Sequence, residues 1–214
     1  MKNFDLHTCE SELKKRWELP YVWGKKQNDD WDKNSNFIYQ IQQWEQFLLK
    51  IKQVSRERNL NHSEFLNYSA NRWYNFNSAM AVESIFTQIE GVKPNINPRN
   101  KLIDFNLGGL DFDLKTSVFP RAFGQSLLYA KKNPENLITW LYNNQSTQGR
   151  QHFANRLFLI VHSEKEDHWK LKAEISWLKH IIEDYVANFK EEQLKKIEFQ
   201  SGKPAFSDII WAIK

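Results

Sequence analysis

Apolar and polar residues alternate along two short runs of the chain, and the pair Gly108-Gly109 joins these runs. Side chains alternate between the two faces of a strand, and a Gly-Gly pair suits a tight turn with positive φ angles. The pattern therefore predicts a β-hairpin over residues 101–117. One face is apolar and is expected to contact the core; it carries Ile103, Phe105, Leu107, Leu110, Phe112 and Leu114. The other face is polar and carries Asp104, Asn106, Asp111, Asp113, Lys115 and Ser117.

The polar face of this hairpin concentrates negative charge. If the two glycines form a two-residue loop, Asn106 faces Asp111 and Asp104 faces Asp113. Like charges at paired cross-strand positions are destabilising, so a strand with a purely structural role is not expected to carry them. A divalent cation held between the carboxylates is the simplest feature that would account for the cluster.

Helical and strand periodicities alternate along the rest of the chain. The spacing of apolar residues predicts helices over 7–17, 37–58, 63–90, 135–153 and 175–197, and a polar loop over 27–36. The continuous apolar run 156–162 is typical of a central, fully buried strand, and 206–213 is either a strand or a docked tail. A buried central strand with helices before and after it predicts the α/β fold class, with a central mixed β-sheet flanked by helices.

Asp104, followed after the turn by Asp113-Leu114-Lys115, resembles the core motif of the PD-(D/E)XK nuclease superfamily, which includes many restriction endonucleases. In that family the first acid lies on one strand and the (D/E)xK triplet on the next. A glutamate is often supplied by the preceding helix, and Glu83 fits that place here. The resemblance implies a restriction-endonuclease-like core.

The resemblance covers about residues 70–130 and departs from the motif at one position. Ile103 stands where the motif has a proline, which leaves Asp111 open as an alternative to Asp104 for the first acid. We expect residues 1–214 to form a single domain. Within it, 1–62 would be a helical N-terminal extension and 63–214 the nuclease-like α/β core.

The activity that the resemblance implies is Mg²⁺-dependent hydrolysis of DNA phosphodiester bonds, with Mn²⁺ as a substitute metal. Asp104, Asp113 and the main-chain carbonyl of Leu114 would be metal ligands, and Glu83 would bind a second metal or tune the first. Lys115 would orient the attacking water and offset charge in the transition state. Asp104, Asp113, Lys115 and Glu83 are thus the predicted catalytic residues.

Three residues downstream of the triplet are candidates for substrate binding. Gln125 and Tyr129 match the Q-x-x-x-Y signature of RecB-type members of the same superfamily, and Arg121 precedes them. A four-residue spacing would place Gln125 and Tyr129 on one face of a helix, within reach of a phosphate or a base.

The composition is that of an ordinary globular protein, with 41% hydrophobic and 26% charged residues. The formal net charge of +4 suits a partner such as DNA but is shared by many unrelated proteins. The single cysteine, Cys9, excludes an internal disulfide framework and a cysteine-based zinc cluster. Because the sequence has neither the apolar core of a signal peptide nor a membrane span, we expect a cytoplasmic protein without membrane contact.

Two alternatives compete with a restriction-type endonuclease. The first is a catalytically inactive nucleic-acid-binding or protein-interaction module, in which the three aspartates form a solvated acidic strand face that Lys115 partly neutralises. The second is a repair or recombination nuclease with the same core. A glycosidase with paired carboxylates fits poorly, because a lysine lies beside the acids. The sequence leaves open whether two chains pair as a homodimer to cut both strands.

Overall fold

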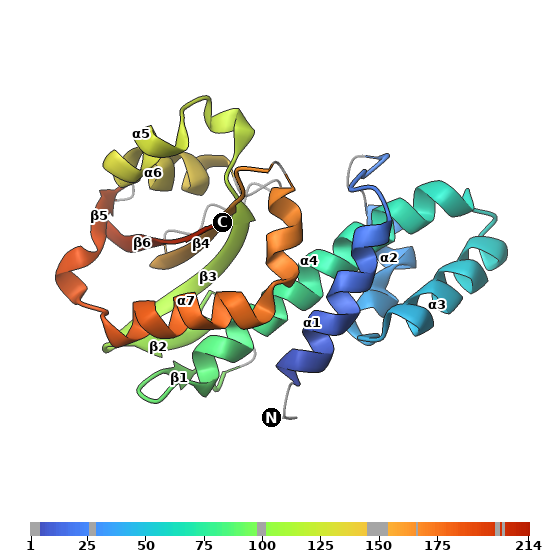
Figure 1. Cartoon of the computed structure of the whole chain (residues 1–214), viewed down its shortest axis with the longest axis horizontal. Helices are drawn as coiled ribbons and strands as arrows, with labels where there is room; N and C mark the ends of the chain where they lie inside the picture. Colours follow the sequence, from blue (N-terminus) through green and yellow to red (C-terminus); the bar gives the residue numbers. More distant parts are fainter. Residues whose placement is uncertain are drawn as a thin grey trace. The chain divides into compact units, whose positions relative to one another are not determined.

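The computed structural model describes residues 5–25, 29–97, 102–144, 154–165, 167–199, 202 and 204–214. Contacts between residues divide the chain into two compact units (Figure 1). The first consists of the described residues up to Val82 together with Lys172–Ser176, and the second of Glu83–Leu171 and Trp177–Lys214. This boundary falls inside helix α4, whereas the sequence-based division separates 1–62 from the rest.

The first unit is helical. It contains α1 (Leu6–Lys15), η1 (Arg16–Glu18), α2 (Asp29–Asn34), η2 (Asn36–Tyr39), α3 (Trp44–Glu57) and the greater part of α4 (His62–Gln88). Its core is aromatic: Trp73 of α4 is fully buried, with its ring centroid 5.2 Å from that of Trp44 and 5.5 Å from that of Phe47. The helices predicted over 37–58 and 63–90 are confirmed as α3 and α4, although α3 begins at Trp44 and a short 3-10 helix precedes it.

The polar loop predicted over 27–36 is wrong, because α2 lies within it. Trp31 is buried, with its ring centroid 5.6 Å from that of Phe65. The Asp32 carboxylate accepts a hydrogen bond from the Tyr68 hydroxyl at 2.6 Å and pairs with Arg72 at 3.2 Å. Contacts with α4 therefore give helical structure to a stretch that has no periodic apolar pattern of its own.

The second unit contains a six-stranded sheet in the order β1-β2-β3-β4-β6-β5. The strands are β1 (Lys93–Pro94), β2 (Phe105–Leu107), β3 (Leu110–Val118), β4 (Arg156–His162), β5 (Lys195–Glu198) and β6 (Pro204–Ile213). The three central strands β3, β4 and β6 run parallel, and the outer pairs are antiparallel. The open mixed sheet with flanking helices confirms the α/β class, the central position of β4 and the strand alternative for 206–213.

Helices cover both faces of this sheet (Figure 1). Leu137, Ile138 and Leu141 of α6 (Pro134–Asn144) pack with Phe158 and Ile209, and α5 (Leu127–Lys132) contributes Ala130 to the same cluster. On the opposite face, the Tyr185 hydroxyl of α7 (Ile175–Ala187) donates to Asp208 of β6 at 3.0 Å. Short 3-10 helices complete the connections: η3 (Arg121–Phe123), η4 (His168–Ala173) and η5 (Glu191–Gln193).

The prediction of one helix over 175–197 is wrong in its second half. Helix α7 ends at Ala187, where the Asn188 side-chain amide donates to the carbonyl of Asp184 at 2.8 Å. The stretch that follows includes β5, whose Ile197 pairs with Ala205 and is buried in the α6 cluster. Of the helix predicted over 135–153, the part up to Asn144 is confirmed, and 145–153 lies outside the described residues.

Candidate active site

The hairpin formed by β2 and β3 has the predicted turn. Gly108 and Gly109 have φ angles of 61° and 90°, which L-residues with a side chain rarely adopt. Leu107 lies opposite Leu110 and Asn106 opposite Asp111, so the predicted register is confirmed next to the turn. The apolar face is buried, and the Phe105 ring stacks on Phe86 of α4 with 4.5 Å between the ring centroids.

Asp104 lies immediately before β2 rather than inside a strand. Its main-chain N–H donates to the carbonyl of Phe112 at 2.8 Å, and its Oδ2 accepts from the N–H of Leu114 at 2.6 Å. The first strand of the hairpin predicted over 101–117 is therefore shorter than expected, since regular pairing stops at Phe105. The carboxylate of Asp104, in place of a main-chain carbonyl, thus accepts the hydrogen bond from the Leu114 N–H of β3.

The segment before β2 is also bonded to Asn95, which follows β1. The main-chain N–H of Asn95 donates to the carbonyl of Asp104 at 3.0 Å, and its side-chain amide donates to the carbonyl of Ile103 at 2.8 Å. Because the ladder of β2 and β3 stops at Phe105, the prediction that Asp104 faces Asp113 as a regular cross-strand pair is wrong.

Asp113 is buried, with only 4% of its surface exposed, and both of its oxygens have a cationic partner. Lys115 Nζ lies 2.5 Å from Oδ1, and Arg156 Nε lies 2.8 Å from Oδ2. Arg156 is the parallel partner of Asp113 on β4, and its guanidinium carbon lies 4.7 Å from the centroid of the Tyr142 ring. The buried carboxylate is thus compensated from two sides, and tyrosine covers the guanidinium.

Sequence reasoning missed Arg156, although one signal was present. It opens the otherwise apolar run of β4, where a charged side chain requires a partner because an unpaired charge is costly to bury.

Glu83 lies in the last part of α4, half-buried. Burial raises its pKa to about 6, and the negative charge of Asp104 acts in the same direction, whereas Lys115 opposes both. The pKa of Asp104 is also raised, first by burial and then by the charge of Asp113, while the Leu114 N–H and Lys115 lower it. The structure therefore brings all four predicted catalytic residues into electrostatic contact, with Lys115 acting on each of the acids.

The donor set at this site is oxygen-rich. Within the described ranges, no group of three His, Cys, Asp or Glu side chains is already arranged to hold a metal ion. Each oxygen of an ionised carboxylate has two acceptor positions, so the bonds of Asp104 Oδ2 and Asp113 leave room for a further partner. The N–H and C=O of one strand residue point the same way, so the Leu114 carbonyl lies on the side of Asp104. Such donors fit Mg²⁺ or Mn²⁺.

Asp111, the alternative first acid, belongs to the turn rather than to this group. It is exposed, and its carboxylate accepts from the Asn106 side chain at 2.8 Å. The charges that raise the pKa values of Glu83 and Asp104, after burial, are those of Asp104 and Asp113 respectively. The geometry therefore favours Asp104 over Asp111 as the partner of Asp113.

The prediction that Gln125 and Tyr129 share a helical face is wrong. The side chain of Ser126 accepts from the Tyr129 N–H at 3.1 Å and caps α5, so the helix begins after Gln125. The Tyr129 hydroxyl accepts from Asn136 at 2.8 Å, and Arg121 is exposed on η3. A role of these residues in substrate binding stays a prediction.

Comparisons of the chain with family models, with curated proteins and with solved structures each found no match. Among the helices in the described ranges, none is long and apolar enough to cross a membrane.

Proposed function

We propose that this protein is a divalent-metal-dependent DNA endonuclease of the restriction type, with a restriction-endonuclease-like core. The observation that carries the proposal is the convergence of Glu83, Asp104, Asp113 and Lys115 around the main chain of Leu114. A cation among these carboxylates would offset the burial of negative charge and the repulsion between the acids, which together raise the pKa values of Glu83 and Asp104.

Each side chain has a role that follows from its surroundings. Asp104 and Asp113 would hold Mg²⁺ together with the Leu114 carbonyl, and Glu83 would complete the oxygen ligands. When bound, the metal supplies positive charge to the phosphate oxygens as water attacks phosphorus. Lys115 keeps contact with solvent, since its side chain is 42% exposed, while its ammonium group lies against Asp113. It can therefore orient the attacking water and offset negative charge in the transition state.

A plasmid cleavage assay with Mg²⁺ tests the proposal. Asp113→Asn should abolish cleavage, because it removes a charged metal ligand while keeping the shape of the side chain. Asp111→Asn is the matched control, since it removes an acid from the same hairpin face outside the cluster, and it should cleave like the wild type. Equal cleavage by all three proteins, or none by the wild type on any duplex or single-stranded substrate with Mg²⁺ or Mn²⁺, would contradict the proposal.

Lys115→Ala separates catalysis from charge balance. Loss of one electrostatic group that acts in the transition state lowers the rate by about a hundredfold. Lys115→Arg should also cleave poorly, because a planar guanidinium does not replace a compact ammonium group. Single-turnover rates should fall in both variants while DNA binding persists. Unchanged rates in a destabilised Lys115→Ala protein would assign Lys115 a structural role.

One observation favours a second candidate function, a nucleic-acid-binding or interaction module without catalysis. The buried pair of Asp113 and Arg156 gives Asp113 a structural role that needs no metal. Under this hypothesis the wild type should bind DNA and leave it uncut in the presence of Mg²⁺. The Asp113→Asn variant should give the same result. Mapping of cut ends on varied substrates would separate a restriction enzyme from a repair nuclease.

A further inference from the structure

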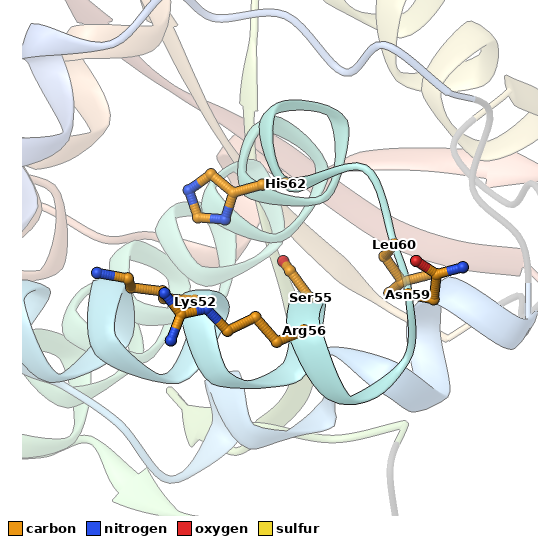
Figure 2. Close-up of a pocket in the computed structure, with 6 residues that line it drawn as sticks. All are labelled: Lys52, Ser55, Arg56, Asn59, Leu60 and His62. Atoms are coloured by element: carbon orange, nitrogen blue, oxygen red, sulfur yellow. The ribbon is translucent and has the colours of Figure 1, made fainter.

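A second polar site lies in the first unit, at the junction of α3 and α4. A cavity of about 520 Å³ is lined by Lys52, Ser55, Arg56, Asn59, Leu60 and His62 (Figure 2). This volume lies within the range of cavities that hold small organic ligands and exceeds the needs of a single inorganic ion. None of these residues is among the predicted catalytic residues Glu83, Asp104, Asp113 and Lys115.

The charged lining of this cavity is basic. Lys52 and Arg56 are four residues apart and therefore share one face of α3, and His62 begins α4. The neighbouring acids are engaged elsewhere: Glu57 accepts from Gln53 at 2.7 Å, and Glu64 pairs with Lys25 at 3.3 Å. The lining therefore presents two permanent cations and one imidazole to a ligand.

Two carbonyl groups at the end of α3 accept hydrogen bonds from the turn that follows, which leaves them less available to oppose an anion. The N–H of Leu60 donates to the carbonyl of Ser55 at 2.9 Å, and that of Asn59 donates to the carbonyl of Arg56 at 3.4 Å. Asn59 has a φ angle of 50°, as expected for a left-handed residue that closes a helix. Helix α4 begins beside the cavity, and the N-terminus of a helix favours negative charge.

One residue that lines the cavity, Ser55, carries a buried hydroxyl group. Ser55 is 5% exposed, and its Oγ has no hydrogen-bond partner among the described residues. In Figure 2 this hydroxyl points from α3 toward the start of α4. A buried polar group without a partner costs about 1–3 kcal/mol. A ligand oxygen that bonds to Ser55 Oγ would remove this penalty.

We propose that this pocket binds the sugar-phosphate unit of a nucleic acid. Arg56 offers a planar donor group that matches phosphate oxygens, Lys52 adds a point charge, and Ser55 supplies a neutral donor. The remaining volume beside Leu60 accommodates the sugar. A backbone phosphate of DNA and the phosphate of a free nucleotide share this chemistry, and the experiment distinguishes them.

The experiment measures binding of a fluorescent DNA duplex by anisotropy in EDTA, together with thermal shifts caused by dAMP, deoxyadenosine and inorganic phosphate. The variant Lys52→Gln/Arg56→Gln should weaken duplex binding about tenfold or more and reduce the slope of log K against log salt by about one to two. Arg58→Gln is the matched control, because Arg58 is exposed at the end of α3 and does not line the cavity. It should bind like the wild type.

Ser55→Ala tests the proposal through two measurements, the thermal stability of the free protein and its stabilisation by phosphate. The free protein should keep or gain thermal stability, because the hydroxyl group that is removed has no partner, while phosphate-dependent stabilisation should fall. A variant that loses stability but binds like the wild type would overturn the assignment, as would equal weakening in the pocket variants and in Arg58→Gln.

The probes decide the source of the phosphate. Pocket-dependent binding of the duplex assigns the backbone of DNA, and pocket-dependent binding of dAMP but not of deoxyadenosine or the duplex assigns a free nucleotide. Absence of any pocket-dependent binding overturns the proposal. The binding assay needs neither metal nor cleavage, so a negative result would not contradict the nuclease proposal. In the same way, absence of cleavage would not contradict the proposal of a sugar-phosphate pocket.

Discussion

Replacing Arg156 with Met would remove the buried cation beside Asp113 and keep most of the side-chain volume. The side chains of the two partners are 7% and 6% exposed, so the remaining charge would have little access to water. Breaking a buried pair by removal of one partner costs about 3–5 kcal/mol of unfolding free energy. Since Lys115 still holds Oδ1, we expect the lower end of this range, about 3 kcal/mol.

The second partner of Asp113 supplies the internal control. Lys115 makes a contact of similar length with the same carboxylate, but its side chain is 42% exposed and its charge is screened by solvent. Lys115→Met should therefore cost about 1 kcal/mol or less. The two variants remove the same unit of charge from the same acid and differ in burial.

Urea unfolding followed by circular dichroism and by tryptophan fluorescence measures both costs. The double variant Asp113→Asn/Arg156→Met should recover part of the loss, because it no longer buries an unpaired charge. Equal costs for the two single variants, or a smaller cost for Arg156→Met, would refute the argument that burial controls the strength of this pair.

Further predictions concern Glu83 and the hairpin turn. The folded-state pKa of Glu83 is about 6 against an ordinary 4.5, so its contribution to stability is present below pH 4.5 and is lost as the pH rises through 6. Glu83→Gln should therefore raise the unfolding free energy at pH 8 by about 1 kcal/mol, allowing for partial exposure, and leave it unchanged at pH 4; a loss at pH 8 would contradict the sign. Mg²⁺ binding at pH 6 should release protons, seen as a dependence of the calorimetric heat on the ionisation enthalpy of the buffer, and Glu83→Gln should reduce this release. Gly108→Ala should cost about 2 kcal/mol and Gly109→Ala about 1 kcal/mol, because both have positive φ angles but only a Cβ at Gly108 would meet Phe189, at 2.8 Å; equal melting temperatures of the two variants would contradict this difference.

Short-range patterns carried the part of the fold that sequence could predict. The hairpin register follows from alternation and the Gly-Gly turn, which act within ten residues of each other. The buried strand β4 and the helices α3 and α4 follow from apolar runs and periodicity. These features depend on local sequence, so no tertiary contact was needed to find them.

The failures share a physical cause, which is that contacts distant in sequence decided the local structure. Strand β5 has one buried apolar residue, Ile197, at a spacing from Leu194 that fits a helix equally well, and its pairing with β6 selects the strand. Helix α2 depends on partners in α4. Asp104 lies outside the regular ladder, where its carboxylate bonds to the Leu114 N–H and Asn95 bonds to the carbonyl groups of Ile103 and Asp104.

The candidate site was predicted as a set of residues but not as an electrostatic environment. The polar hairpin face and the upstream glutamate were visible in the sequence. The pair of Asp113 and Arg156 was not, because the two residues are brought together only by the parallel register of β3 and β4. This register depends on the whole sheet.

The ion pair between Asp113 and Arg156 fits both proposed functions. The other two acids, Glu83 and Asp104, are therefore the residues that distinguish the two functions. A purely structural interpretation explains why Asp113 is buried, since Arg156 compensates its charge. It does not explain why burial, together with the charge of Asp104, raises the pKa of Glu83, or why burial, together with the charge of Asp113, raises the pKa of Asp104. The charged forms of both acids are therefore disfavoured in the folded protein, and Lys115 and the Leu114 N–H offset this cost only in part. A bound divalent cation would be attracted by the same negative charges that are unfavourable without it. A metal site is therefore the hypothesis that accounts for all three acids together.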